Sequence, residues 1–99
     1  MSSKARRRAA ERAEIVARIE AHGYTVRFVE WCEDARTPGF LGQAAGITDH
    51  VHREVKVRDG QPHAWTLAVL RHELEHVEGA EYGTDSPELG LRCGGRGGF

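Results

Sequence analysis

The clearest structural signal in the chain is the stretch PHAWTLAVLRHELEHVEG, residues 62–79. Its apolar residues recur at steps of three and four, which is the spacing of one helix face: Leu67, Leu70, Leu74 and Val77. Pro62 suits the first turn of such a helix, where its missing N–H costs nothing. A second face lies roughly opposite the first and holds Trp65, Val69, His72 and His76. We therefore expect a helix over residues 63–79, with one face on the core and the other lining a cleft.

Upstream of this helix, the sequence predicts two strands and a further helix. Residues 47–58 alternate, with Val51, Val55 and Val57 on one face, and the turn signal Asp59-Gly60 follows. Residues 24–31 predict another strand, and the glycine-rich residues 32–46 predict a long loop. An apolar stripe at helical spacing predicts an N-terminal helix over residues 4–22. We expect an α+β domain whose two helices pack on a small sheet of two or three strands.

Composition limits the class of protein. The chain has 99 residues, a net charge of −1, 39% hydrophobic and 29% charged residues, which is typical of one soluble globular domain. With no membrane-spanning apolar run and no recognisable secretory signal, a cytoplasmic protein is expected. Cys32 and Cys93 match no metal or redox spacing and are expected to be reduced thiols. Residues 1–90 are expected to form one domain, and residues 91–99 a flexible glycine-rich tail.

The helix carries a motif with metal-binding chemistry, His72-Glu73-Leu74-Glu75-His76, which has the pattern HExxH. Residues four apart lie one turn apart on the same helix face, so both imidazoles can reach one tetrahedral Zn²⁺ ion. Glu73 is rotated by about 100° from His72, where its carboxylate can take a proton from a zinc-bound water whose pKa is about 7. The sequence therefore predicts His72 and His76 as ligands and Glu73 as the catalytic base. The alternative is a charged helix face with two surface histidines.

A catalytic zinc ion needs a third protein ligand and one open position. After Gly79 the chain offers Glu81, Tyr82 and Asp85. We expect Asp85 to be the ligand, because it lies in a turn that can fold the chain back under the metal. Glu81 and Tyr82 are the alternatives, and Tyr82 could instead donate a hydrogen bond to a developing oxyanion.

Residues 46–79 resemble the core of ImmA/IrrE-type metallopeptidases, on the stretch GITDHVHREVKVRDGQPHAWTLAVLRHELEHVEG. The specific elements are HExxH, the Thr66-Leu67 pair ahead of it and the preceding strand. The resemblance implies a minimal zincin-like fold, zinc on His72 and His76, Glu73 as base, and limited proteolysis of a protein such as a transcriptional repressor. Members of the family often occur in phages, mobile elements and actinobacteria. The chain departs from the family at Glu75, where a small residue is usual, and leaves little room after Gly79 for the later helix that carries the family's third ligand, a Glu.

The N-terminal residues KARRRAAER, 4–12, are basic. A solvated helix end is the favoured interpretation, because no aromatic residues interleave with the arginines and the next segment predicts a strand rather than a second DNA-binding helix. Neither nucleic acid nor a membrane is therefore expected as a partner.

The function predicted from the sequence is zinc-dependent hydrolysis of peptide bonds in a protein or peptide substrate, such as a regulatory protein. If the strand 47–58 lies at an edge beside the metal, it can pair with an extended substrate. One alternative is a non-catalytic zinc-binding interaction module, or a degenerate peptidase that regulates a partner. Another is a nucleic-acid-binding regulator that works through the N-terminal helix.

Overall fold

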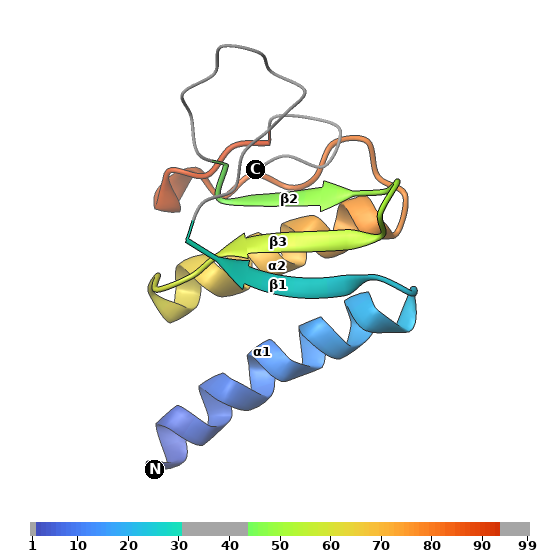
Figure 1. Cartoon of the computed structure of the whole chain (residues 1–99). Coiled ribbons are helices and arrows are strands. Elements are labelled where there is room, and N and C mark those ends of the chain that lie inside the picture. Colours follow the sequence, from blue (N-terminus) through green and yellow to red (C-terminus); the bar gives the residue numbers. More distant parts are fainter. Residues whose placement is uncertain (1, 31–43, 94–99) are drawn as a thin grey trace.

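A computed structural model of the chain describes residues 2–30 and 44–93. Its elements are α1 (Ser3–Ala21), β1 (Thr25–Val29), β2 (Gly46–Asp49), β3 (Glu54–Arg58), α2 (His63–Val77) and a short 3-10 helix, η1 (Pro87–Leu89). The strands form one mixed sheet in the order β1-β3-β2, in which β1 is parallel and β2 antiparallel to the central strand β3. The expected α+β class, with two helices packed on a small sheet, is confirmed (Figure 1).

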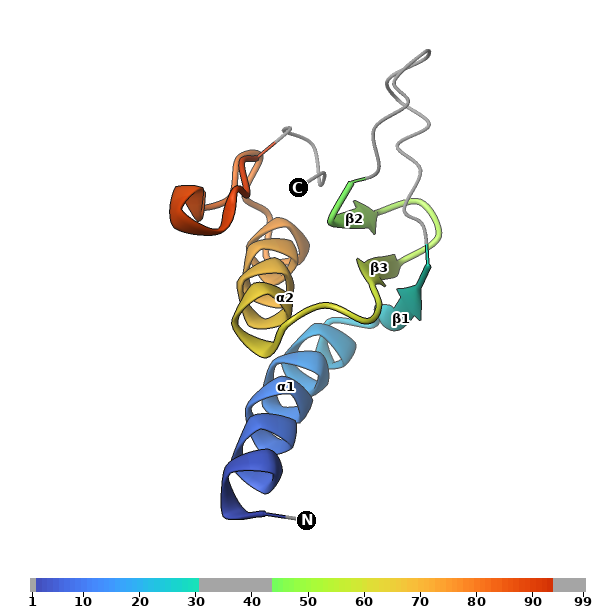
Figure 2. The ribbon, with the colours of Figure 1, turned by 90° about the vertical axis from the view of Figure 1, so that its left-hand side faces the viewer.

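The helices cover one face of the sheet. Helix α2 packs on β2 and β3, while α1 packs on α2 and β1 (Figure 2). Central strand β3 shows why: Val55 and Val57 are fully buried, whereas Glu54 on the opposite face pairs with Arg27 and Lys56 at 3.5 and 3.6 Å. The core between the layers is apolar and includes Ile15, Ile19, Val55, Val57, Leu67, Leu70 and Leu74.

The single strand expected over residues 47–58 is wrong, because the structure has a hairpin there, formed by β2 and β3. The Asp49 carboxylate accepts the backbone N–H groups of Val51 and His52 at 2.9 and 3.0 Å, and Arg53 has a φ of 51°. Such side-chain hydrogen bonds favour a turn over extended pairing. Val51, expected on the inner face, lies in this turn and is 87% exposed.

The domain also extends further than expected towards the C-terminus. Leu91, the first residue of the predicted tail, is buried in the core and forms a β-bridge with Ser86. Packing on the core therefore includes Leu91, while residues 94–99 lie outside the described residues, as does most of the predicted loop 32–46. Neither helix in the described ranges is long and apolar enough to cross a membrane.

Candidate metal centre

The two histidines of HExxH meet on one face of α2. Each side chain is only 1% exposed, and the two Nε2 atoms lie 2.9 Å apart. The ring centroids are 4.7 Å apart, as expected for residues one helical turn apart on one face. The structure therefore brings the His72 and His76 rings together, and the Nδ1 atoms of both contact the segment after α2.

Hydrogen bonds fix the protonation of both rings. His72 Nδ1 donates to the backbone oxygen of Thr84 at 2.9 Å, and His76 Nδ1 donates to that of Ala80 at 2.8 Å. A carbonyl oxygen can only accept, so in each neutral ring the proton is on Nδ1 and Nε2 presents a lone pair. Two lone pairs that face each other at 2.9 Å need a cation or a proton between them. Burial lowers the pKa of His76, which disfavours a proton on that ring.

A third donor lies next to the histidine pair. Cys93 Sγ is 3.7 Å from His76 Nε2, and the donor atoms of His72, His76 and Cys93 all lie within 4.8 Å of one another. Imidazole nitrogen and thiolate sulfur are the donors that zinc prefers. The three residues could therefore hold a metal ion, and their donor atoms are of the kinds that suit zinc.

The segment after α2 holds Cys93 in position. The Gly83 backbone N–H donates to Cys93 Sγ at 3.3 Å, and the Cys93 backbone N–H donates to Asp85 Oδ1 at 2.7 Å. A Cβ atom on Gly83 would lie 2.7 Å from His72 Nδ1, so only glycine lets this segment close over the ring. The Glu75 carboxylate accepts a hydrogen bond from the backbone N–H of Thr84 at 2.5 Å, which joins the same segment to α2. Glu75 is the position at which ImmA/IrrE-type enzymes usually have a small residue.

The residues expected from the sequence to supply the third ligand lie elsewhere. Asp85 is not part of the three-residue group found among residues 2–30 and 44–93, and its Oδ1 accepts the N–H of Cys93. Glu81 and Tyr82 are exposed, Tyr82 to 71%. The structure thus makes Asp85 a support of Cys93 rather than a neighbour of the histidine pair.

Cys93 was not predicted from the sequence because no metal-binding spacing surrounds it. It follows His76 by 17 residues and forms no CxxC pair. Its approach depends on the turn through η1 and on the bridge between Ser86 and Leu91, which reverse the chain. Only its position in a glycine-rich segment close after HExxH was visible in the sequence.

The predicted base, Glu73, lies under the edge strand β2. Its side chain is 0% exposed, and Thr48 Oγ1 donates to its Oε2 at 2.8 Å. The strand approaches α2 closely here, since a Cβ atom on Gly46 would lie 2.6 Å from Val69 Cγ1 and 3.1 Å from Glu73 Cγ. Thr48 was not singled out from the sequence, although it is the described residue that orients this carboxylate through a side-chain hydrogen bond.

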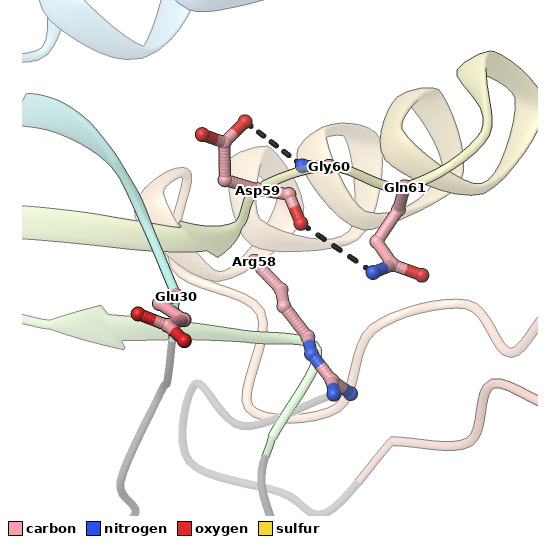
Figure 3. A pocket seen from close by; sticks show the side chains of 5 residues that line it. All are labelled: Glu30, Arg58, Asp59, Gly60 and Gln61. Atoms are coloured by element: carbon pink, nitrogen blue, oxygen red, sulfur yellow. Dashed lines mark hydrogen bonds between the residues drawn. The ribbon is translucent and has the colours of Figure 1, made fainter.

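A separate hollow lies at the end of β3 and is lined by Glu30, Arg58, Asp59, Gly60 and Gln61 (Figure 3). Its hydrogen bonds are local to the turn: Gly60 N donates to Asp59 Oδ1 at 2.9 Å, and Gln61 Nε2 donates to the Asp59 carbonyl at 3.4 Å. None of the HExxH residues lines it, so it is not part of the candidate metal centre.

The chemical interpretation of the site depends on the arrangement of its residues. Two buried imidazoles of α2 and a thiol from the segment after it come together, and Glu73, one residue after His72, is buried against Thr48 of β2. Comparison of the chain with protein-family models, with curated proteins and with solved structures finds no match.

Proposed function

We propose that the chain is a zinc-dependent metallopeptidase with a minimal zincin-like fold, as the resemblance to ImmA/IrrE-type enzymes implies. The metal ligands would be His72, His76 and Cys93, and Glu73 would be the general base. The observation that carries the proposal is the pair of Nε2 atoms 2.9 Å apart, each opposite an Nδ1 that donates to a carbonyl. Such outer hydrogen bonds are what fixes the ring orientation and tautomer of metal-ligating histidines.

The residues around the site have distinct roles in this reaction. A zinc ion held there would act as a Lewis acid and would lower the pKa of a water ligand to about 7. Glu73 takes the proton from the attacking water and transfers it to the leaving amine of the scissile bond. Thr48 holds the carboxylate of Glu73 in one orientation through the hydrogen bond at 2.8 Å.

The expected substrate is a protein or peptide segment in extended conformation. Strand β2 lies at one edge of the sheet and packs on α2, so it runs beside the helix that carries HExxH. An edge strand binds an extended chain through main-chain hydrogen bonds, which supports a peptide as the substrate and leaves side-chain specificity weak.

The first experiment measures zinc and hydrolysis together. The purified chain should contain one zinc per molecule and should cleave a mixture of unstructured peptides, with new termini identified by mass spectrometry. Glu73→Gln should keep the zinc and lose about 10²- to 10⁴-fold in rate, as for other general bases. The matched control is Glu78→Gln, which removes an exposed carboxylate at the end of the same helix. It should change neither the zinc content nor the rate of hydrolysis. A wild-type chain that binds no zinc would overturn the proposal.

The second experiment tests the thiolate ligand without relying on activity. Cobalt substituted for zinc should give a near-ultraviolet thiolate-to-cobalt charge-transfer band. Cys93→Ser should lose that band, whereas Cys32→Ser should keep it. A band that persists in Cys93→Ser would remove Cys93 from the ligand set.

A non-catalytic zinc module is the second candidate, and one observation favours it. His72, Glu73 and His76 are 1%, 0% and 1% exposed, and structural zinc sites are closed whereas catalytic sites keep an open position. A small hydroxamate should shift the cobalt spectrum if the metal has an exchangeable position. An unchanged spectrum, together with zinc-dependent stability and no hydrolysis, would favour the structural role.

A further inference from the structure

A groove with several cationic side chains lies between α1 and α2, and the metal-centre side chains His72, His76 and Cys93 do not line it. Lys4, Arg7 and Arg8 reach it from α1 and Arg71 from α2, over a floor that includes Leu67. All four cationic residues are exposed, and none is within ion-pair distance of a carboxylate in the described part of the chain. The one acidic lining residue, Glu11, lies 3.8 Å from His63 Nε2. The groove is therefore strongly positive.

The helix directions add to this charge. Helices α1 and α2 both begin at the same end of the molecule (Figure 1), and residues from the first turn of each line the groove. Neither helix has an acidic residue in its first turn. Ser2 Oγ already accepts the Ala5 N–H at the start of α1, so what the two helix ends add is their partial positive charge, which favours an anion.

We propose that this groove binds the phosphate backbone of a nucleic acid. The basic N-terminal residues alone favour a solvated helix end, but the fold places Arg71 and the start of a second helix beside them. Arginine forks match phosphate oxygens in a bidentate manner. This surface is independent of the proposed hydrolysis, and its failure would leave the metal centre untouched.

An acidic protein partner fits the groove less well. Protein interfaces place apolar or aromatic anchors at their centre. The large hydrophobic side chains that are exposed among the described residues are Phe28, Val51 and Tyr82, and none of them lines the groove. A charged surface without an apolar anchor suits contacts with the phosphate backbone of a nucleic acid, which do not depend on the base sequence.

The affinity for DNA should depend steeply on salt. Four contacts, from Lys4, Arg7, Arg8 and Arg71, predict a slope of log K against log salt of about −3.6, or ~150-fold weaker binding at 200 mM than at 50 mM salt. Fluorescence anisotropy with the full chain and a labelled duplex measures this directly. Two duplexes of unrelated sequence should bind equally.

Substitutions on both sides of the groove locate the contact. Arg7→Gln and Arg71→Gln should each reduce the slope by about 0.9 and weaken binding at 50 mM salt by about tenfold. The control is Arg6→Gln, which removes the same charge from the exposed part of α1 but does not line the groove.

Three results would overturn the proposal. The first is no binding of the duplex at 50 mM salt. The second is an equal loss of affinity in Arg6→Gln and Arg7→Gln, which would indicate that the duplex responds to the charge of α1 in general and not to the groove. The third is tighter binding of polyglutamate than of the duplex at equal charge concentration, which would assign the groove to an acidic protein.

Discussion

Replacing Thr48 by valine tests the contact that orients the proposed base. Valine has nearly the same volume but no hydroxyl, so the change removes the hydrogen bond donated to Glu73 Oε2 at 2.8 Å. Thr48 is 2% and Glu73 0% exposed, so bulk water cannot readily replace the lost donor. We expect both stability and hydrolysis to fall.

The size of the stability loss follows from the charge that Glu73 must carry to act as the proposed base. A hydrogen bond to a charged group contributes about 1.5–3 kcal/mol, and its loss in a buried place should cost the upper part of that range. We expect Thr48→Val to lower the free energy of unfolding by roughly 2–3 kcal/mol. For a domain of this length, that corresponds to a fall in the melting temperature of roughly 10–20 °C.

Urea unfolding with excess zinc throughout provides the assay. Thr48→Ser keeps the hydroxyl and loses one methyl group, so it should cost only about 1 kcal/mol. In a Glu73→Gln background the acceptor is neutral, and the cost of Thr48→Val should fall to about 0.5–1.5 kcal/mol. The difference between the backgrounds isolates the contact. A valine variant as stable as the serine variant, or a cost that is the same in both backgrounds, would refute the reasoning.

Three further predictions concern zinc binding at the His72 ring, the pH dependence of stability and the hairpin of β2 and β3. Gly83→Ala should weaken zinc binding in chelator competition, because the added Cβ would lie 2.7 Å from the His72 ring, while Tyr82→Ala on the exposed neighbour should not. Burial lowers the pKa of His76 below 6.5, so the unfolded chain takes up the proton first as the pH falls. The chelator-treated chain should therefore have its full stability above about pH 6.5 and lose it at lower pH, and a flat urea midpoint from pH 8 to 5.5 would contradict this. Val55→Ala should lower the free energy of unfolding by about 2 kcal/mol, because Val55 is fully buried. Val51→Ser, at a position 87% exposed, should lower it by less than about 0.5 kcal/mol. Equal losses would contradict the hairpin and support a single strand over residues 47–58.

The features that the sequence predicted well are those set by local periodicity. The apolar stripe of residues 63–79 corresponds to α2 (His63–Val77), and the four-residue spacing of His72 and His76 brings their rings together. Both follow from helix geometry alone. The hairpin was missed because residues 51–58 continue the alternation of β3, while the hydrogen bonds of the Asp49 side chain that make the turn leave no trace in periodicity.

The third donor and the partner of the base could not be predicted for a different reason. Cys93 reaches the histidines only because Gly83, Glu75 and Asp85 fasten the segment after α2. Thr48 reaches Glu73 only because Gly46 lets β2 approach α2. Each contact joins residues far apart in the chain and depends on packing that a periodic pattern does not encode.

Asp85 offers the sharpest test between the ligand set expected from the sequence and the one proposed from the structure. If Asp85 binds the metal, its negative charge matters. If it positions Cys93, it needs only an oxygen that accepts the Cys93 N–H at 2.7 Å. Asparagine keeps that oxygen and removes the charge, so Asp85→Asn should retain most of the zinc affinity and the thiolate band of the cobalt form.

Asp85→Ala should weaken zinc binding by about 10- to 100-fold, the usual effect of losing a residue that orients a ligand. Competition with a chromogenic chelator measures both variants against Cys93→Ser. If Asp85→Asn lost as much affinity as Cys93→Ser, the carboxylate would be bound to the metal itself. The hydrogen bond from the Cys93 N–H occupies Oδ1, so a bound metal would then have to take the other carboxylate oxygen of Asp85.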